Sequence, residues 1–149
     1  MPPFDPGNFK LGPSTIRVIV GTVPAVGAEI VETVPAGVIW RVCSISFQHT
    51  TAAGGGNRQL IIEVDDGTDI FYSIGSNEQH GGGLTVRFSF STAGPFPGDT
   101  LAGGGLMPIL PLPAEFYLLA GHRIRTVVEN LAAGDQFTAP VLLVEEFPS

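Results

Sequence analysis

Apolar and polar residues alternate with a period of two along most of this chain, and that alternation limits the folds open to it. The segment LTVRFSFS (84–91) places leucine, valine and phenylalanine on one face and threonine, arginine and serine on the other. This period is typical of a β-strand with one buried face. The segments TIRVIVGTV (15–23), NRQLIIEVDD (57–66) and VIWRVCSISFQHT (38–50) repeat it. In the last, a change of phase between Trp40 and Val42 predicts either a β-bulge or a strand end that is covered on both sides.

The remaining pattern also predicts strands, and no apolar repeat of 3.6 residues lasts long enough to predict a helix. The further strands are AEIVETV (28–34), DIFYSI (69–74), EFYLLA (115–120), RIRTVVEN (123–130) and QFTAPVLLVEE (136–146). Gly-rich and Pro-rich breaks separate them, with 20 glycines and 13 prolines in 149 residues. We therefore expect an all-β fold, a single antiparallel β-sandwich or jelly roll of about eight to nine strands.

Two segments stand outside the alternation. Residues 1–14 hold four prolines and two glycines, which predicts an extended N-terminal arm ahead of a sandwich domain at 15–149. The arm still carries Phe4, Phe9 and Leu11, which a purely solvated tail does not need. The second segment, 91–114, is a long Gly/Pro-rich loop with an apolar part, LMPILPLP (106–113). That part is compatible with a polyproline-like ligand segment, a strand at an interface or an ordinary packed loop. Loops of this length in compact domains are usually functional, and we expect this one to contact another subunit.

Composition narrows the partners and the compartment. Charged residues make up 14% of the chain, against about 25% in typical domains. The net charge of −7 argues against nucleic acid and anionic membranes as partners. The one cysteine, Cys43, excludes an internal disulfide, and its place among core-facing residues predicts a buried, inert thiol. With no signal peptide in MPPFDPGNFK and no membrane span, we expect synthesis in a cytoplasm.

One spacing recurs at the starts of strands. AGVIW (36–40), PGDTL (97–101), AGHRI (120–124) and AGDQF (133–137) each place a large apolar residue three positions after a glycine. This predicts a turn at the glycine and an inward side chain on the following strand. Arg123 and Arg125 then share the outer face of their strand. They either form surface ion pairs, with Glu115, Glu129, Glu145 or Glu146, or contact an acidic partner.

No catalytic, metal or cofactor motif is present in the sequence. EVDDGTDI (63–70) lacks the ligand spacing of a calcium loop, and its Asp66-Gly67 pair predicts a β-hairpin instead. His49, His80 and His122 lie on separate segments without metal-ligand spacing, so only folding can bring a metal site together. We expect neither an enzyme nor a cofactor.

Several segments together resemble small virion proteins of tailed bacteriophages. These are VPAGVIWRVCSISF, TTAAGGGNRQLIIEVDDG, LPAEFYLLAGHRIRTVVENLAAGDQF and the final LLVEE, spread over roughly residues 34–146. The resemblance implies a compact β-sandwich that assembles on the particle, as a capsid decoration (cement) protein or as a head–tail or tail component. It carries no catalytic residue to this chain.

The resulting hypothesis is a decoration protein on the capsid surface of the virion. It would bind the lattice of the major capsid protein as a symmetric oligomer, expected to be a homotrimer. The expected contact residues are Phe4, Phe9 and Leu11 in the arm, Met107, Ile109 and Leu110 in the loop, and Arg123 and Arg125 on the strand. The alternatives are a head–tail connector or tail protein, a carbohydrate-binding module with Trp40, Phe71 or Tyr72 as its aromatics, and a metal-dependent jelly-roll enzyme.

Overall fold

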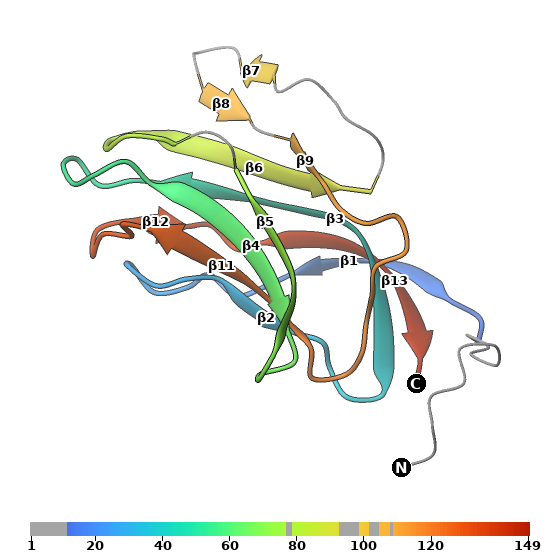
Figure 1. Cartoon of the computed structure of the whole chain (residues 1–149). Coiled ribbons are helices and arrows are strands. Elements are labelled where there is room, and N and C mark those ends of the chain that lie inside the picture. The colour runs from blue at the N-terminus through green and yellow to red at the C-terminus, as the bar shows by residue number, and fades with distance from the viewer. Residues whose placement is uncertain (1–11, 77–78, 93–98, 102–104, 108) are drawn as a thin grey trace.

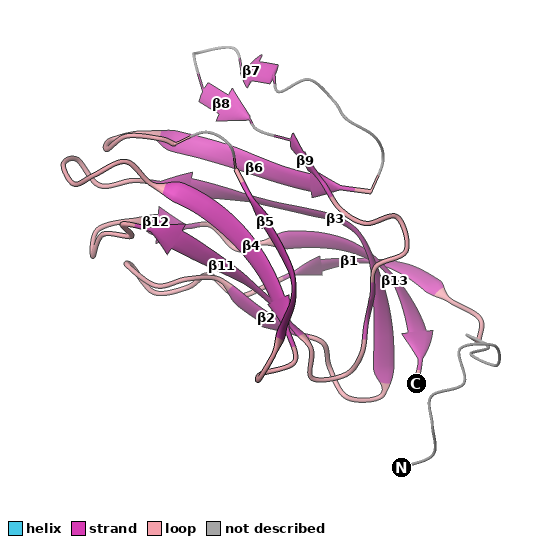
Figure 2. Cartoon of the chain, in the orientation of Figure 1, coloured by secondary structure: helices cyan, strands magenta, loops and turns pink. Residues whose placement is uncertain are grey.

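Two β-sheets pack face to face in the computed structural model (Figure 1). The structure describes residues 12–76, 79–92, 99–101, 105–107 and 109–149, and this part of the chain consists of strands and loops without a helix (Figure 2). The all-β sandwich expected from the alternation is therefore confirmed. Its jelly-roll connectivity stays a prediction.

The larger sheet is built around one long central strand. In spatial order it contains β1 (Thr15–Val20), β13 (Val141–Pro148), β3 (Val38–Thr50), β6 (Thr85–Ser91) and β9 (Ile109–Pro111). Two short strands, β10 (Tyr117–Leu118) and β12 (Gln136–Phe137), also pair with β3. Neighbours are antiparallel except β6 and β9, which run parallel. Strand β1 forms one edge, and no described strand pairs with its outer side.

The second sheet covers the inner face of the first. Its order is β2 (Val31–Thr33), β11 (Arg123–Glu129), β4 (Gln59–Asp65) and β5 (Ile70–Gly75), all antiparallel. A separate hairpin of β7 (Asp99–Leu101) and β8 (Gly105–Met107) lies next to β9 in Figure 1. The hairpin predicted at Asp66-Gly67 joins β4 to β5: Gly67 has a φ of 98°, and the Asp66 carboxylate accepts the amides of Thr68 and Asp69.

The core follows the alternation that the sequence shows. On β6 the side chains of Val86, Phe88 and Phe90 are buried, and the residues between them point outward. Phe47 on β3 lies 5.7 Å from Phe88, measured between ring centroids. Leu84, which the pattern placed on the same face, precedes the strand and is 45% exposed, so that part of the prediction is wrong.

A bulge changes the inward face of β3, which is one of the two alternatives that the phase change predicted. Leu143 pairs with Ser44 and Val144 pairs with Val42, so Cys43 is an extra residue between two ladder positions. Trp40 and Val42 are therefore buried before the bulge, and the buried face continues from Ile45 after it. Cys43 is consequently half-buried rather than fully buried, and its thiol donates a 3.8 Å hydrogen bond to the carbonyl of Arg41.

Two boundary predictions were wrong for backbone reasons. The segment 136–146 is interrupted before Val141, because Pro140 has no N–H for the ladder, and it forms β12 and β13 instead of one strand. The loop at 91–114 contains β7, β8 and β9. Strand β9 joins the main sheet at Ile109–Pro111 through parallel pairing with β6, which a local alternation pattern does not reveal.

The recurring glycine spacing has two different structural causes. Gly37 and Gly121 have φ values of 83° and 87°, which favour glycine, so the turn prediction is confirmed there. Gly134 has no such φ. A Cβ at that position would lie 3.0 Å from the Cβ of Ala52, so glycine permits a close approach of two loops. Trp40, Ile124 and Phe137 are buried as expected, whereas the side chain of Leu101 lies outside the described residues.

Candidate functional site: an exposed apolar stripe and a buried ionic cluster

The outer face of the larger sheet carries an exposed stripe of aliphatic side chains along its β1 edge. Ile16, Val18 and Val20 are 61%, 66% and 67% exposed. Across the β1–β13 ladder, Leu143 pairs with Val18 and Val141 pairs with Val20, and both are also exposed. These five residues, here called the β1 stripe, form one contiguous apolar surface. Surfaces of this kind often mark a contact with another molecule.

The stripe arises because the apolar residues of β1 lie mainly on its outward face, with Ile19 as the apolar residue of the inward face. Ile19 points inward and packs against the core, which leaves the intervening residues on the outside. The sequence grouped Ile16, Val18 and Val20 correctly on one face, and the structure shows that this face is the exposed one. The second sheet covers the inner face of an edge strand only in part. The alternation along such a strand therefore groups residues by face but does not show which face points to the core.

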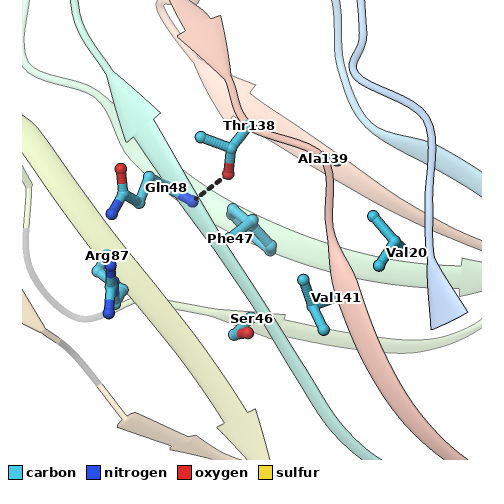
Figure 3. Close-up of a pocket in the computed structure, with 8 residues that line it drawn as sticks. All are labelled: Val20, Ser46, Phe47, Gln48, Arg87, Thr138, Ala139 and Val141. Carbon is cyan, nitrogen blue, oxygen red and sulfur yellow. Dashed lines mark hydrogen bonds between the residues drawn. The ribbon is translucent and has the colours of Figure 1, made fainter. Parts of the chain in front are cut away.

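A shallow depression of about 450 Å³ adjoins the stripe (Figure 3). It is lined by Val20, Ser46, Phe47, Gln48, Arg87, Thr138, Ala139 and Val141. Gln48 donates its backbone N–H to the Thr138 hydroxyl at 2.9 Å, and Arg87 stands opposite Gln48 in the β3–β6 register. This lining holds no nucleophile beside a base, so the depression is suited to contact rather than to chemistry.

The predicted arginine pair lies on the other sheet and is paired within the chain. Arg123 Nε contacts Asp65 Oδ1 at 2.7 Å, and Arg125 contacts Glu63 Oε2 at 2.6 Å and Asp65 Oδ2 at 2.8 Å. The hydrogen bond from Arg123 lowers the pKa of Asp65. Ion pairing was anticipated, but the predicted glutamate partners were wrong, because β11 pairs with β4 and aligns both arginines with acids there.

The other predicted contact residues are distributed unevenly. Phe4, Phe9 and Leu11 lie outside the described residues, and of Met107 only the place in β8 is described. Ile109 and Leu110 lie in β9 and are half-buried. Leu110 packs against the chain's own core, so part of its apolar surface is already covered without another subunit.

The aromatics considered for a glycan site do not form one surface. Trp40 is only 3% exposed, and its indole N–H donates to Glu146. The ring of Tyr72 packs against Phe116, with a centroid distance of 4.9 Å. Phe71 alone is well exposed, beside His122. The structure therefore contradicts Trp40 as a glycan platform.

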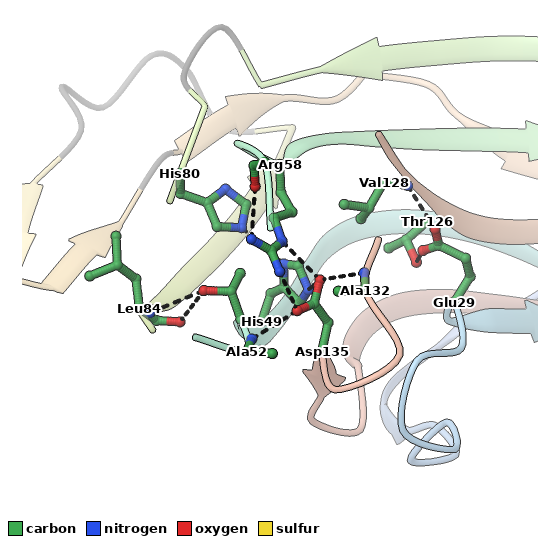
Figure 4. A network of polar contacts seen from close by, with 12 residues as sticks. Glu29, His49, Ala52, Arg58, His80, Leu84, Thr126, Val128, Ala132 and Asp135 are labelled. Carbon is green, nitrogen blue, oxygen red and sulfur yellow. Dashed lines mark hydrogen bonds and ion pairs between the residues drawn. The ribbon is translucent and has the colours of Figure 1, made fainter. Parts of the chain in front are cut away.

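A buried ionic cluster at one end of the sandwich escaped the sequence analysis (Figure 4). Arg58 and Asp135 are both fully buried and form a two-pronged pair, with Nε–Oδ2 at 3.0 Å and Nη2–Oδ1 at 2.9 Å. Arg58 Nη1 also donates to the carbonyls of Gly54 and Gly56. The Asp135 carboxylate accepts the backbone amides of Ala52 and Ala132 as well. Backbone groups of the surrounding loops thus complete the hydrogen bonds of both charged side chains.

Two histidines complete the cluster. His49 Nδ1 lies 2.9 Å from His80 Nε2, and His49 Nε2 lies 3.8 Å from Asp135 Oδ2. The His49 ring stacks on Phe137 at 4.3 Å. Burial, together with the neighbouring His80, lowers the pKa of His49 to about 4, and burial also lowers that of His80. Both rings are therefore neutral at pH 7.

The charges in the cluster suit a structural role better than a metal. Burial would raise the pKa of Asp135, but hydrogen bonds from Arg58 and from two backbone amides lower it to about 2. The Arg58 guanidinium occupies the carboxylate and would repel a cation beside the histidines. Within the described residues, no group of three or more histidine, cysteine, aspartate or glutamate side chains is placed to hold a metal.

No protein-family model matches the sequence, and a search of curated proteins found no match either. In the part of the chain that the structure describes, no helix is long and apolar enough to cross a membrane.

Proposed function

We propose that this protein is a structural component of an assembly that docks through the β1 stripe and the N-terminal arm. Most specifically, we propose a capsid decoration protein of a tailed bacteriophage that binds the lattice of the major capsid protein on the virion surface. The specific form rests on the resemblance of segments within residues 34–146 to small phage virion proteins. The general form rests on the stripe.

The exposed stripe is the observation that carries the proposal. Ile16, Val18 and Val20 each leave more than half of their surface exposed on a rigid sheet face. Burying a valine or isoleucine side chain contributes about 1.5–3 kcal/mol, so such a face gains most by binding another apolar surface. The adjoining depression has small side chains at Ser46 and Ala139 and the charged Arg87 in its lining, and it leaves room for a partner's side chain.

The arm has a fixed starting point near the same edge. The described chain begins at Gly12, beside the ring of Pro148, and Ser14 hydrogen-bonds Glu145 of β13. The described chain thus begins next to β1 and β13. Phe4, Phe9 and Leu11 would supply apolar anchors, and prolines reduce the entropy lost when such a segment orders on a partner.

Binding to undecorated capsids tests the proposal. The variants are a deletion of residues 1–13 and the triple substitution Ile16→Thr, Val18→Thr and Val20→Thr. We expect both to keep the unfolding midpoint close to that of the parent protein and to lose co-sedimentation with particles. A matched control, Ile70→Thr with Leu119→Thr, removes exposed apolar side chains elsewhere and should bind normally. Undiminished binding by both test variants would refute the proposal.

The alternative of a head–tail connector or tail protein uses the same stripe and differs in copy number. Quantitative mass spectrometry of purified particles separates the two, because a decoration protein covers the shell and a connector occupies one vertex. The homotrimer expected from the sequence stays a prediction. Sedimentation equilibrium measures the number of chains per oligomer.

A further inference from the structure

We propose that two copies of this chain associate through their β1 edges, in antiparallel register about a twofold axis at Val18. The two larger sheets would then continue into each other across the contact. This inference rests on strand geometry and does not depend on the proposed phage function.

The main-chain groups of β1 alternate between its two sides, and one hydrogen bond identifies which residues face outward. The Gly21 N–H donates to the Pro140 carbonyl at 2.8 Å, directly after the ladder in which Val20 pairs with Val141. Position 21 therefore faces β13, and in an antiparallel ladder every second residue does the same. Ile16, Val18 and Val20 must then direct their N–H and C=O groups toward the open edge. No described strand takes these groups.

Three registers pair at least two of these three residues with one another, and one of the registers satisfies all three. Centred on Val18, the pairing places Ile16 opposite Val20 of the second copy and Val18 opposite itself. All six outward N–H groups of the two strands then meet carbonyls. The same register places apolar side chains opposite each other on the outer face, which is the favourable cross-strand arrangement.

The two neighbouring registers are less favourable, one because it brings like charges together and the other because it needs an N–H that is already hydrogen-bonded. A shift centred on Arg17 sets the two guanidinium groups directly opposite each other, which is destabilising. A shift centred on Ile19 places Ile16 opposite Thr22, whose N–H is already bonded to Glu32 at 2.7 Å. In the register centred on Val18, Arg17 faces Ile19 instead and keeps its ion pair with Glu146. Charge repulsion at Arg17 and the hydrogen bond already made by Thr22 thus select the register centred on Val18.

A second copy fits this edge better than an unrelated strand because the edge is complementary to itself and is unprotected. Edge strands are normally blocked by proline, lysine, a bulge or very short length. Strand β1 has six residues, TIRVIV, without proline or lysine, and its inward-pointing charge, Arg17, is paired with Glu146. By contrast, the edge strands β9 and β2 have three residues each, and β9 ends in proline. The remaining edge strand of the two sheets, β5, has six residues but is bulged at Phe71, between the pairs Val64–Tyr72 and Asp65–Ile70. The contact joins single strands, so we expect an interface below about 1,200 Å² and a concentration-dependent dimer.

The first test is mass across a concentration series by sedimentation equilibrium, with two variants at the central position. Val18→Pro removes an outward N–H at the axis and leaves the ladder to β13 intact. Val18→Thr keeps the main chain and a strand-forming side chain. We expect a dimer for the parent and for Val18→Thr, and at least a tenfold weaker dimer for Val18→Pro. Urea unfolding confirms that both variants fold. A monomer at all concentrations, a trimer, or a dimer that Val18→Pro leaves unchanged would overturn the inference.

The second test reads the register. In a Cys43→Ser background, Val18→Cys brings two thiols together across the axis. The Cα atoms of a hydrogen-bonded antiparallel pair lie about 5.5 Å apart, within disulfide range. Ile16→Cys in the same background separates the thiols by four residues along the pair. We expect mild oxidation to cross-link the first variant and not the second, and the reverse result would overturn the register. Dimerisation only after removal of residues 1–11 would show that the chain covers its own edge.

Discussion

At the level of single residues, the buried Arg58–Asp135 pair contributes strongly to the free energy of unfolding. Both side chains are fully buried, so removal of one leaves the other as a buried charge without an opposite charge. We expect Asp135→Ala to lower the free energy of unfolding by about 3–5 kcal/mol, as for other broken buried pairs. Chemical denaturation measures this loss.

Two further variants define what that loss means. Arg17→Met removes an exposed ion pair with Glu146 and should cost no more than about 1 kcal/mol. Arg58→Met combined with Asp135→Leu removes both buried charges, and we expect it to be more stable than Asp135→Ala alone. A double variant as unstable as the sum of its parts would mean that the loops need each charge separately.

The buried histidines make stability depend on pH in a defined direction. His49 has a pKa of about 4 when folded, against 6.5 when free, so the unfolded chain binds a proton more readily. Its contribution is complete above pH 6.5 and is lost as the pH falls toward 4. With about 1.4 kcal/mol for each tenfold difference in proton affinity, the change is roughly 3 kcal/mol. Denaturation at a series of pH values measures it, and His49→Gln should flatten the profile across that window.

The residues of this cluster differ in how far the sequence reveals them. His49 continues the buried alternation of Ile45 and Phe47 on β3, so its inward direction can be read from the pattern. Arg58 and Asp135 cannot be found in this way. Each lies in or beside a glycine-containing loop, and the two are 77 positions apart in sequence. Only the packing of three loops against one another brings them together.

At the level of elements, the β4–β5 hairpin gives a clean test of glycine conformation. Gly67 has a φ of 98° and open space around its Cα, so a methyl group there meets strain and no clash. We expect Gly67→Ala to destabilise the protein by about 1–2 kcal/mol, measured by thermal or urea unfolding. Gly81→Ala is the matched control, because its φ is ordinary and its new Cβ would meet the nearest atom at 3.9 Å. Equal effects of both substitutions would contradict this explanation.

The strands themselves were largely predictable, and the exceptions have physical causes. β3, β4, β6 and β11 lie within the predicted segments because one face of each is buried along its whole length. β9 was anticipated only as one alternative, a strand at an interface, because three residues next to prolines carry no periodic signal. Its parallel pairing with β6, distant in sequence, was not predicted. For β1 the strand was predicted correctly, but its outward face became clear only from its place at the sheet edge.

At the level of the whole molecule, the buried ionic cluster and the proposed contact surface lie in different parts of the sandwich. The buried cluster lies where the loops before β4, after β5 and after β11 meet, and it joins loops of both sheets. The β1 edge lies on the outer side of the larger sheet and carries the exposed aliphatic residues. The buried cluster therefore holds the loops at one end of the sandwich, and the exposed aliphatic residues of the β1 edge remain free to contact another molecule.

Hydrogen exchange can show whether the cluster is part of the same cooperative unit as the core. Outside the regular strands, the Arg58 N–H donates to the His80 carbonyl at 2.9 Å, and the His80 N–H donates to the Arg58 carbonyl at 3.0 Å. If the cluster closes this end of the sandwich, we expect these two amides to be as protected at pH 7 as those of β3 and β6. In Asp135→Ala they should exchange at least tenfold faster than the strand amides of the same variant. A uniform loss of protection would instead mean that breaking the ion pair opens the whole sandwich at once.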